Sequence, residues 1–129
     1  MTALPLILVV DDFDDNRAMY AEYLALKGFR VVEASDGEQA VAQATQLLPS
    51  LVVMDLSLPG IDGWEATRRL KSDARTKHIV ILALTGHAEP SHAQRARDAG
   101  CDDFVAKPCL PDELLAKVRG LLGDDAPAA

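Results

Sequence analysis

The chain has 129 residues, 49% of them hydrophobic and 26% charged, which is enough apolar material for one self-sufficient core. Its 20 acidic residues outnumber its 13 basic ones and give a formal net charge of −7, so we expect no nucleic-acid partner, because phosphate-backbone binding needs clustered cations. No apolar run reaches the roughly 18 residues of a membrane span, and no basic segment precedes the first apolar stretch. We therefore expect a cytoplasmic protein with no membrane partner, in which Cys101 and Cys109 are free thiols.

Short runs rich in β-forming residues alternate with segments of helical periodicity along the chain. The runs occupy residues 6–10, 30–33, 51–54, 79–84 and 103–105. This alternation is typical of strand–helix units around a parallel sheet, and the nearly wholly apolar first, third and fourth runs are expected to be covered on both faces. The sequence predicts an α/β fold in one domain over residues 1–123, followed by a short disordered tail at 124–129.

Each of the five predicted helices begins or ends at a residue that favours such a boundary. In chain order, these residues are Asp14 and Asp15 with the exit Gly28, the capping box that starts at Ser35, Asp62, Gly100 after a fourth helix at 90–99, and Pro111. The fourth helix offers mainly alanines to the sheet, whereas the fifth carries a stripe of leucine and valine. Because alanine contributes little by burial, we expect the fourth helix to be the most weakly held.

Reactive side chains stand at the ends of four of the five predicted strands. They are Asp11 and Asp12 after the first strand, Asp55 after the third, Thr85 after the fourth and Lys107 after the fifth. Because open α/β sheets place their ligand sites at the carboxyl ends of the strands, we expect these side chains to share one cleft. Three carboxylates repel one another and are tolerated best with a hard cation such as Mg²⁺. A carboxylate beside such an ion, a lysine and a hydroxyl can accept a phosphoryl group.

The residues around these positions carry a family resemblance. The segments are Asp11-Asp12, Met54-Asp55-Leu56-Ser57-Leu58-Pro59-Gly60, Ala83-Leu84-Thr85-Gly86 and Lys107-Pro108. Over roughly residues 5–122 the chain resembles the receiver domain of two-component response regulators, and is similar to stand-alone members such as the bacterial chemotaxis response regulator. The resemblance implies a flavodoxin-like, doubly wound parallel sheet of five strands in the order 2-1-3-4-5, with five helices.

The resemblance also implies a phosphoacceptor and a metal site. Asp55 corresponds to the phosphoacceptor. Asp11, Asp12 and Asp55 correspond to the metal-binding carboxylates, with Asp12 in direct contact and Asp11 acting mainly through water. The main-chain carbonyl of Ser57 corresponds to the remaining protein ligand, and the ion expected is Mg²⁺ or Mn²⁺.

Three further positions match residues that sense the phosphoryl group. Thr85 and Lys107 correspond to the residues that grip its oxygens, while Thr85 and Phe104 correspond to the switch pair. The Lys107–Pro108 bond is expected to be cis by the same resemblance. His87, two positions after the threonine, stands where side chains in the family tune dephosphorylation, and an ordinary exposed loop residue is an equally good interpretation.

The function that the resemblance implies is that of a signalling protein, which catalyses only its own phosphorylation and dephosphorylation. The expected donor is a phospho-histidine on a histidine kinase or a histidine phosphotransfer protein. A downstream protein is expected to bind the face made by the fourth helix, fifth strand and fifth helix, or to take the phosphate onward. The sequence shows no output domain, which favours a single-domain response regulator.

Two other classes of function stay open at this point. A haloacid-dehalogenase-type phosphatase also uses an aspartate nucleophile, Mg²⁺ and a lysine, but its DxDx(T/V) signature fails here because Asn16 stands at the last position. A receiver-like binding module without phosphotransfer would not need to retain Thr85 and Lys107. Nucleotide-binding motifs of the GxxxxGK[ST] and GxGxxG types are absent from the sequence.

Overall fold

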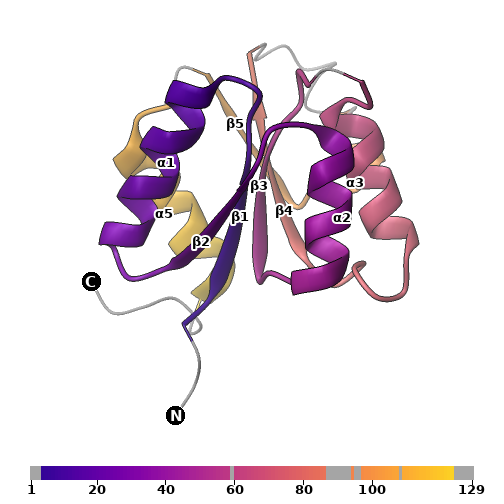
Figure 1. The fold of residues 1–129 in the computed structure, drawn as a ribbon, viewed down its shortest axis with the longest axis horizontal. Coiled ribbons are helices and arrows are strands. Elements are labelled where there is room, and N and C mark those ends of the chain that lie inside the picture. Colours follow the sequence, from indigo (N-terminus) through magenta and orange to yellow (C-terminus); the bar gives the residue numbers. More distant parts are fainter. Residues whose placement is uncertain (1–3, 59, 87–93, 95–96, 108, 124–129) are drawn as a thin grey trace.

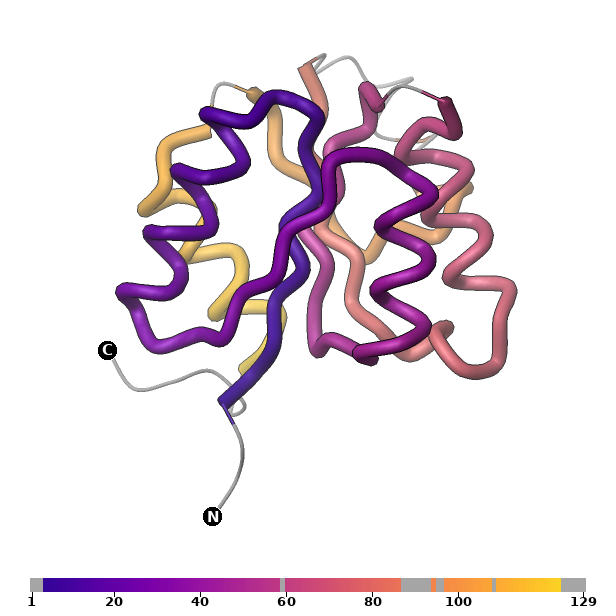
Figure 2. Tube along the Cα trace, viewed as in Figure 1, coloured from indigo at the N-terminus to yellow at the C-terminus, as the bar shows by residue number. Residues whose placement is uncertain are grey.

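The computed structural model describes residues 4–58, 60–86, 94, 97–107 and 109–123. Five parallel strands form one sheet in the order β2-β1-β3-β4-β5, which confirms the predicted fold class and strand order. The strands are β1 (Leu6–Val10), β2 (Arg30–Ala34), β3 (Leu51–Asp55), β4 (Val80–Thr85) and β5 (Asp103–Ala106). The carboxyl ends of all five strands lie at one edge of the sheet, which is the upper edge in Figure 2.

Helices cover both faces of the sheet. Their bounds are α1 (Asp14–Leu26), α2 (Gly37–Leu47), α3 (Gly63–Ser72) and α5 (Pro111–Leu122). Helices α1 and α5 lie on one face, and α2 and α3 on the other (Figure 1). Most of the fourth helix predicted at 90–99, and the tail predicted at 124–129, lie outside the described residues; Gln94 and residues 97–99 are helical.

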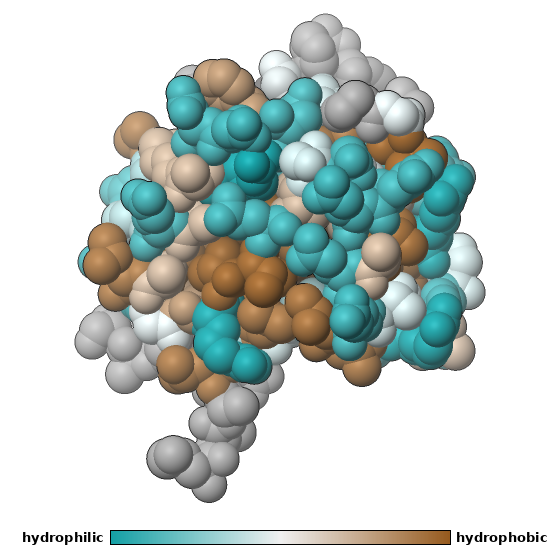
Figure 3. All heavy atoms as spheres, viewed as in Figure 1, coloured by the Kyte–Doolittle hydropathy of each residue, from teal (hydrophilic) through white to brown (hydrophobic). Residues whose placement is uncertain are grey.

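Two hydrophobic cores, one on each face, hold the layers together. Successive residues of β1 alternate between them: Leu8 and Val10 belong to the core under α2 and α3, whereas Ile7 and Val9 belong to the core under α1 and α5. All four are completely buried, as expected for a strand with helices on both faces. The edge strand β2 is less covered, and hydrophobic side chains are visible at the surface over it, between α1 and α2 (Figure 3). The central strands are therefore more completely buried than the edge strands.

Two predicted helix starts were wrong. The first helix is preceded by Phe13, whose apolar side chain cannot accept a capping bond, and the predicted caps Asp14 and Asp15 lie inside the first turn. The Asp14 carboxylate pairs there with the Arg17 guanidinium at 2.6 Å. At the second helix the cap is Asp36 rather than Ser35, since the Asp36 carboxylate accepts from the Gln39 main-chain N–H at 2.8 Å. The predicted boundaries that the structure confirms are the Asp62 cap, Gly28 and Gly100 with left-handed φ angles, and Pro111 in the first turn of α5.

The strand ends differ from the prediction by one residue. Asp55 and Thr85 are the last residues of β3 and β4 rather than the first residues after them. Both therefore belong to the hydrogen-bonded ladder, with Asp55 opposite Leu84 and Thr85 opposite Ala106. Their side chains gain a fixed direction from the sheet. None of the described helices is long and apolar enough to cross a bilayer.

Candidate functional site

Three carboxylates meet at the carboxyl edge of the sheet. Asp11 and Asp12 follow β1, and Asp55 ends β3, which lies beside β1. Each offers an oxygen, and these oxygens all lie within 4.8 Å of one another. Asp11 is 1% exposed and Asp55 3%, whereas Asp12 is exposed. The structure thus gathers two buried acids and one that faces solvent, as the strand order predicted.

The main chain around Asp11 is fixed at three points. Its N–H donates to the Ala34 carbonyl at 3.2 Å, at the end of β2. Its carboxylate Oδ1 accepts from the Phe13 N–H at 2.9 Å, and its own carbonyl accepts from the Arg17 guanidinium at 2.9 Å. Asp12 lies between these anchored positions. The place of its exposed carboxylate is therefore set by the turn that carries it.

Lys107 neutralises part of this acidic cluster. Its Nζ lies 3.0 Å from Oδ2 of Asp55 and 3.6 Å from Oδ2 of Asp11. Its main-chain N–H donates to the Thr85 carbonyl at 2.7 Å, which ties the chain after β5 to the end of β4. The other Asp55 oxygen accepts from the Ser57 N–H at 3.0 Å. Each Asp55 oxygen thus accepts a hydrogen bond from a described residue and has further lone pairs.

Burial and charge shift the pKa values in this cluster. Burial raises the pKa of the Asp11 carboxyl, although the Phe13 N–H and the Lys107 charge act in the opposite direction. For Lys107, burial lowers the pKa, but the hydrogen bond and charge of Asp55, with the charge of Asp11, outweigh it and raise the pKa overall. Lys107 is therefore held in its charged form. Its single positive charge faces two buried carboxylates, those of Asp11 and Asp55.

The donor set fits a hard divalent cation. Oδ2 of Asp11 is buried and accepts no hydrogen bond from the described residues, and the Lys107 ammonium is too far from it to donate one. A buried carboxylate oxygen without a donor is costly unless a cation compensates for it. The cluster offers only oxygen ligands, which suit Mg²⁺ better than zinc. The residues present therefore match the ion that the sequence led us to expect.

Two glycines, which have no side chain, allow the loop between β3 and α3 to pack closely against neighbouring backbone. A Cβ at Gly63 would collide with the Asp55 carbonyl and lie 2.7 Å from the Cα of Leu56. A Cβ at Gly37, in the first turn of α2, would collide with the Ile61 carbonyl. Larger residues at these positions would move the loop that carries Ser57. The loop is therefore fixed by close backbone packing at both of its sides.

The remaining predicted residues take separate places. Thr85 is 5% exposed at the carboxyl end of β4, on the strand next to Asp55. Phe104 lies within β5, partly buried against the core under α2 and α3, and the Arg97 guanidinium carbon is 5.8 Å from its ring centroid. His87 and the Lys107–Pro108 bond involve residues outside the described part of the chain. The structure therefore brings Asp11, Asp12, Asp55 and Lys107 into direct proximity. It places Phe104 on β5, which β4 separates from the strand of Asp55.

The cysteines behave as the sequence predicted. Cys101 and Cys109 are both free and buried. Burial raises the pKa of the Cys101 thiol to about 11, although a contact with the Thr67 hydroxyl at 3.9 Å partly opposes this shift. A thiol with so high a pKa is a poor nucleophile at neutral pH, which favours a packing role.

Sequence reasoning missed Arg17. Its guanidinium joins the acidic turn, the start of α1 and Glu33 of β2. A weak signal existed, because a basic residue three positions after Asp14 on a helix can form an ion pair with it. The contact with the Asp11 carbonyl had no signal, since it depends on how the chain enters α1.

The chain is similar in sequence to a known family of domains and to two characterised proteins. The family model described as the response regulator receiver domain matches residues 7–119. A DNA-binding dual master transcriptional regulator, RpaA of Synechocystis, is 38% identical over 92% of this chain and 49% of its own length. The polar-differentiation response regulator DivK of Brucella anthropi is 28% identical over 92% of this chain and 96% of its own length. The chain thus spans about half of the first of these relatives and nearly all of the second.

A solved structure also contains the ion that the site fits. The receiver domain of the sensor histidine kinase PA1611 from Pseudomonas aeruginosa, with a magnesium ion coordinated in its active-site cleft, superimposes with a TM-score of 0.86. It is 32% identical, and the match covers 95% of this chain and all of that one.

Proposed function

Since the chain belongs to the response regulator receiver domain family, we propose that its Asp55 carboxylate accepts a phosphoryl group from a phospho-histidine in a Mg²⁺-dependent reaction. The observation that carries this proposal is the 3.0 Å contact between Lys107 Nζ and Asp55, inside a cluster of three carboxylates. A nucleophilic oxygen, a fixed cation and a metal-type donor set occupy one edge of the sheet. No other cluster of three metal-type side chains occurs among the described residues.

The transfer step places these residues in distinct roles. An Asp55 oxygen forms a bond to phosphorus while the bond from phosphorus to the donor imidazole nitrogen breaks. The electron pair of the broken bond leaves with the nitrogen. The Lys107 ammonium and the Thr85 hydroxyl stabilise the negative charge on the transferred oxygens. The Ser57 N–H keeps the Asp55 carboxylate oriented toward the incoming group.

The acidic side chains would hold the metal. Asp12 and Asp55, with the Ser57 carbonyl, are the proposed direct ligands, and the orphaned oxygen of Asp11 is the proposed acceptor for water bound to the ion. When bound, Mg²⁺, or Mn²⁺ in its place, neutralises charge on the transferred group. Lys107 alone is not enough for this, because its single positive charge is already shared between the carboxylates of Asp55 and Asp11.

The proposed switch lies in β4 and β5. The Thr85 hydroxyl moves toward the phosphoryl group, and the Phe104 ring takes up the space that this movement leaves. The surface of β5 and α5, with the helical residues before β5, then changes its affinity for a downstream protein. Phosphorylation shifts a population between two arrangements. The proposed donor is a histidine kinase or a phosphotransfer protein. Once phosphorylated, the protein either binds a downstream partner as a single-domain regulator or passes the phosphate onward.

Acetyl phosphate tests the acceptor directly. With Mg²⁺, the intact mass is expected to increase by one phosphoryl group, and Asp55→Asn is expected to abolish the gain. Asp62→Asn is the matched control, because it makes the same charge change in the adjoining loop and Asn caps a helix as well as Asp. Asp12→Ala should slow labelling by at least about tenfold. Label retained by Asp55→Asn, or continuous release of phosphate from small phosphoesters by the unsubstituted protein, would contradict the proposal.

A further inference from the structure

We propose that Arg17 is a positioning residue for metal binding, because it holds the main chain of the turn that presents Asp12. This inference rests on the proposed Mg²⁺ site. Arg17 itself is not a ligand. It acts through the carbonyl of Asp11, the residue before the exposed carboxylate.

The guanidinium of Arg17 is locked by three acceptors from three parts of the fold. It donates to the Asp11 carbonyl at 2.9 Å, to the Asp14 carboxylate at 2.6 Å and to the Glu33 carboxylate at 3.2 Å. Only 16% of its side chain is exposed. Because a guanidinium group is planar and rigid, it loses little conformational entropy for each hydrogen bond that it donates. Arg17 therefore fixes the turn to α1 and to β2 together.

The exposed carboxylate needs such support more than its neighbours do. Asp55 is fixed by the ladder of β3, by Ser57 and by Lys107. Within the described residues the Asp12 side chain makes no hydrogen bond or ion pair, so the main chain on either side determines its position. On one side stands the Asp11 carbonyl held by Arg17, and on the other the Phe13 N–H held by the Asp11 carboxylate.

Charge alone predicts the opposite effect. Arg17 stands between Asp14 and Glu33, so its removal leaves two uncompensated carboxylates, which would attract a cation more strongly. Both carboxylates are well exposed, and salt therefore screens this attraction. Salt does not screen the effect of a misplaced Asp12 main chain on metal binding. Comparing Mg²⁺ affinity at low and high salt separates the two effects.

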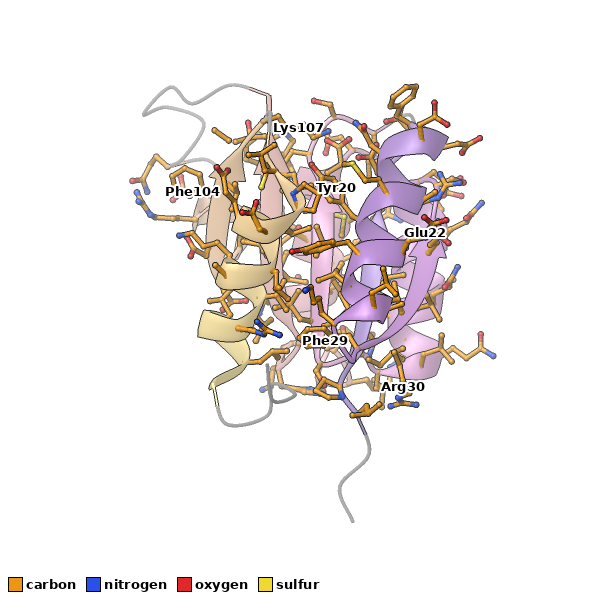
Figure 4. All side chains as sticks on the ribbon, turned by 90° about the vertical axis from the view of Figure 1, so that its left-hand side faces the viewer. Tyr20, Glu22, Phe29, Arg30, Phe104 and Lys107 are labelled. Carbon is orange, nitrogen blue, oxygen red and sulfur yellow. The ribbon has the colours of Figure 1, made fainter. Side chains whose placement is uncertain are left out.

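The experiment is an Mg²⁺ titration of Arg17→Met followed by amide NMR. At high salt we expect the Kd for Mg²⁺ to rise about tenfold, as for other groups that orient a metal ligand. Arg30→Met is the matched control: Arg30 also donates to a main-chain carbonyl, that of Leu4, but lies at the opposite end of the sheet from Lys107 (Figure 4). The Kd of the Arg30→Met variant for Mg²⁺ should equal that of the unsubstituted protein.

A second variant separates positioning from the general attachment of α1. Glu33→Gln removes the ion pair with β2 and leaves the contact between Arg17 and Asp11. It should therefore keep the Mg²⁺ affinity of the unsubstituted protein at high salt. An increase in Kd as large as that of Arg17→Met would overturn the inference, because attachment of the helix would then explain both variants.

Metal-free hydrogen exchange provides an independent readout. The Phe13 amide is expected to exchange faster in Arg17→Met, whereas amides within β3 should keep their protection. Unchanged Phe13 protection together with an unchanged Kd at high salt would refute the proposal. Absence of Mg²⁺ binding by the unsubstituted protein would instead contradict the proposed function, and the Phe13 amide would still report whether Arg17 holds the turn.

Discussion

Tyr20 joins α1 to the chain segment that leads into α5. The residue is 4% exposed, and its hydroxyl donates to the Cys109 carbonyl at 2.8 Å; Figure 4 labels its side chain. Burial, with smaller contributions from nearby negative charges, raises the pKa of this phenol from 10.0 to about 12. The folded protein therefore holds the phenolic proton more tightly than the unfolded chain does.

Tyr20→Phe is expected to lower the free energy of unfolding by about 1–3 kcal/mol at neutral pH, because the buried Cys109 carbonyl loses its donor. In the unsubstituted protein, stabilisation by the raised pKa is complete below pH 10.0 and is lost as the pH rises through about 12. The variant should lose less stability over that range. Urea denaturation across this pH range measures both effects.

Tyr23→Phe is the control, since it also removes a hydroxyl from α1 and should change the free energy of unfolding by about 0.5 kcal/mol or less. Equal losses in the two variants would contradict a specific role for the Tyr20 hydroxyl.

The reactive residues were predictable from the sequence, whereas their supports were not. Asp11, Asp12, Asp55 and Lys107 are polar groups at or directly after the carboxyl ends of strands, and parallel strands place such residues together. Arg17 and Gly63 act through contacts with main-chain atoms of the site. Those contacts depend on how each loop folds back over its strand, which hydrophobic periodicity does not describe.

At the scale of elements, Lys71 fastens the end of α3 to the sheet. Its ammonium donates to the Ile79 carbonyl at 2.6 Å and to the Asp102 carboxylate at 3.0 Å. The same Asp102 oxygen accepts from the Ile81 N–H at 2.7 Å. The Lys71 stem passes over Gly100, where a Cβ would come within 2.8 Å of it. One side chain thus links α3, β4 and the chain before β5.

Lys71→Met should lower the free energy of unfolding by about 1–3 kcal/mol, because the carbonyl of the buried residue Ile79 loses the Lys71 ammonium as its hydrogen-bond donor. Lys117→Met is the matched control: its 3.0 Å pair with Asp103 is half exposed, and such pairs contribute about 0–1 kcal/mol. Urea denaturation of both variants gives the comparison. A loss for Lys117→Met as large as that for Lys71→Met would show that charge, rather than the carbonyl contacts, is responsible.

The existence and order of the elements were predictable, but their exact starts were less so. Apolar runs and helical periodicity indicated every strand and helix that the structure describes. Asp14 and Asp15 were the expected caps of α1, yet both lie within its first turn, and the Asp14 carboxylate pairs with Arg17. Ser35 and Asp36 are both residue types that suit a cap, so residue type alone does not distinguish them; in the structure Asp36 takes this role.

At the scale of the whole molecule, the proposed Mg²⁺ site couples metal binding to the stability of the fold. Mg²⁺ at one hundred times its Kd should raise the free energy of unfolding by about 2.7 kcal/mol, because the ion binds the folded chain and not the unfolded one. Urea denaturation with Mg²⁺ and with a chelator measures the gain.

Asp12→Ala provides the control for this gain. It should lose the response to Mg²⁺ and, in the metal-free state, be more stable than the unsubstituted protein, since it removes repulsion among three carboxylates. Equal stabilisation of both proteins by Mg²⁺ would place the ion elsewhere.

The strand order also determines when the site becomes complete during synthesis. β1 and β3 are neighbours in the sheet, so the three acids can come together once Asp55 has left the ribosome. Lys107 lies beyond β5 and leaves the ribosome last among the four charged groups. A nascent chain therefore passes through a stage in which the acids meet without their lysine. Divalent cations in the cell would favour correct pairing of β1 with β3 during that stage.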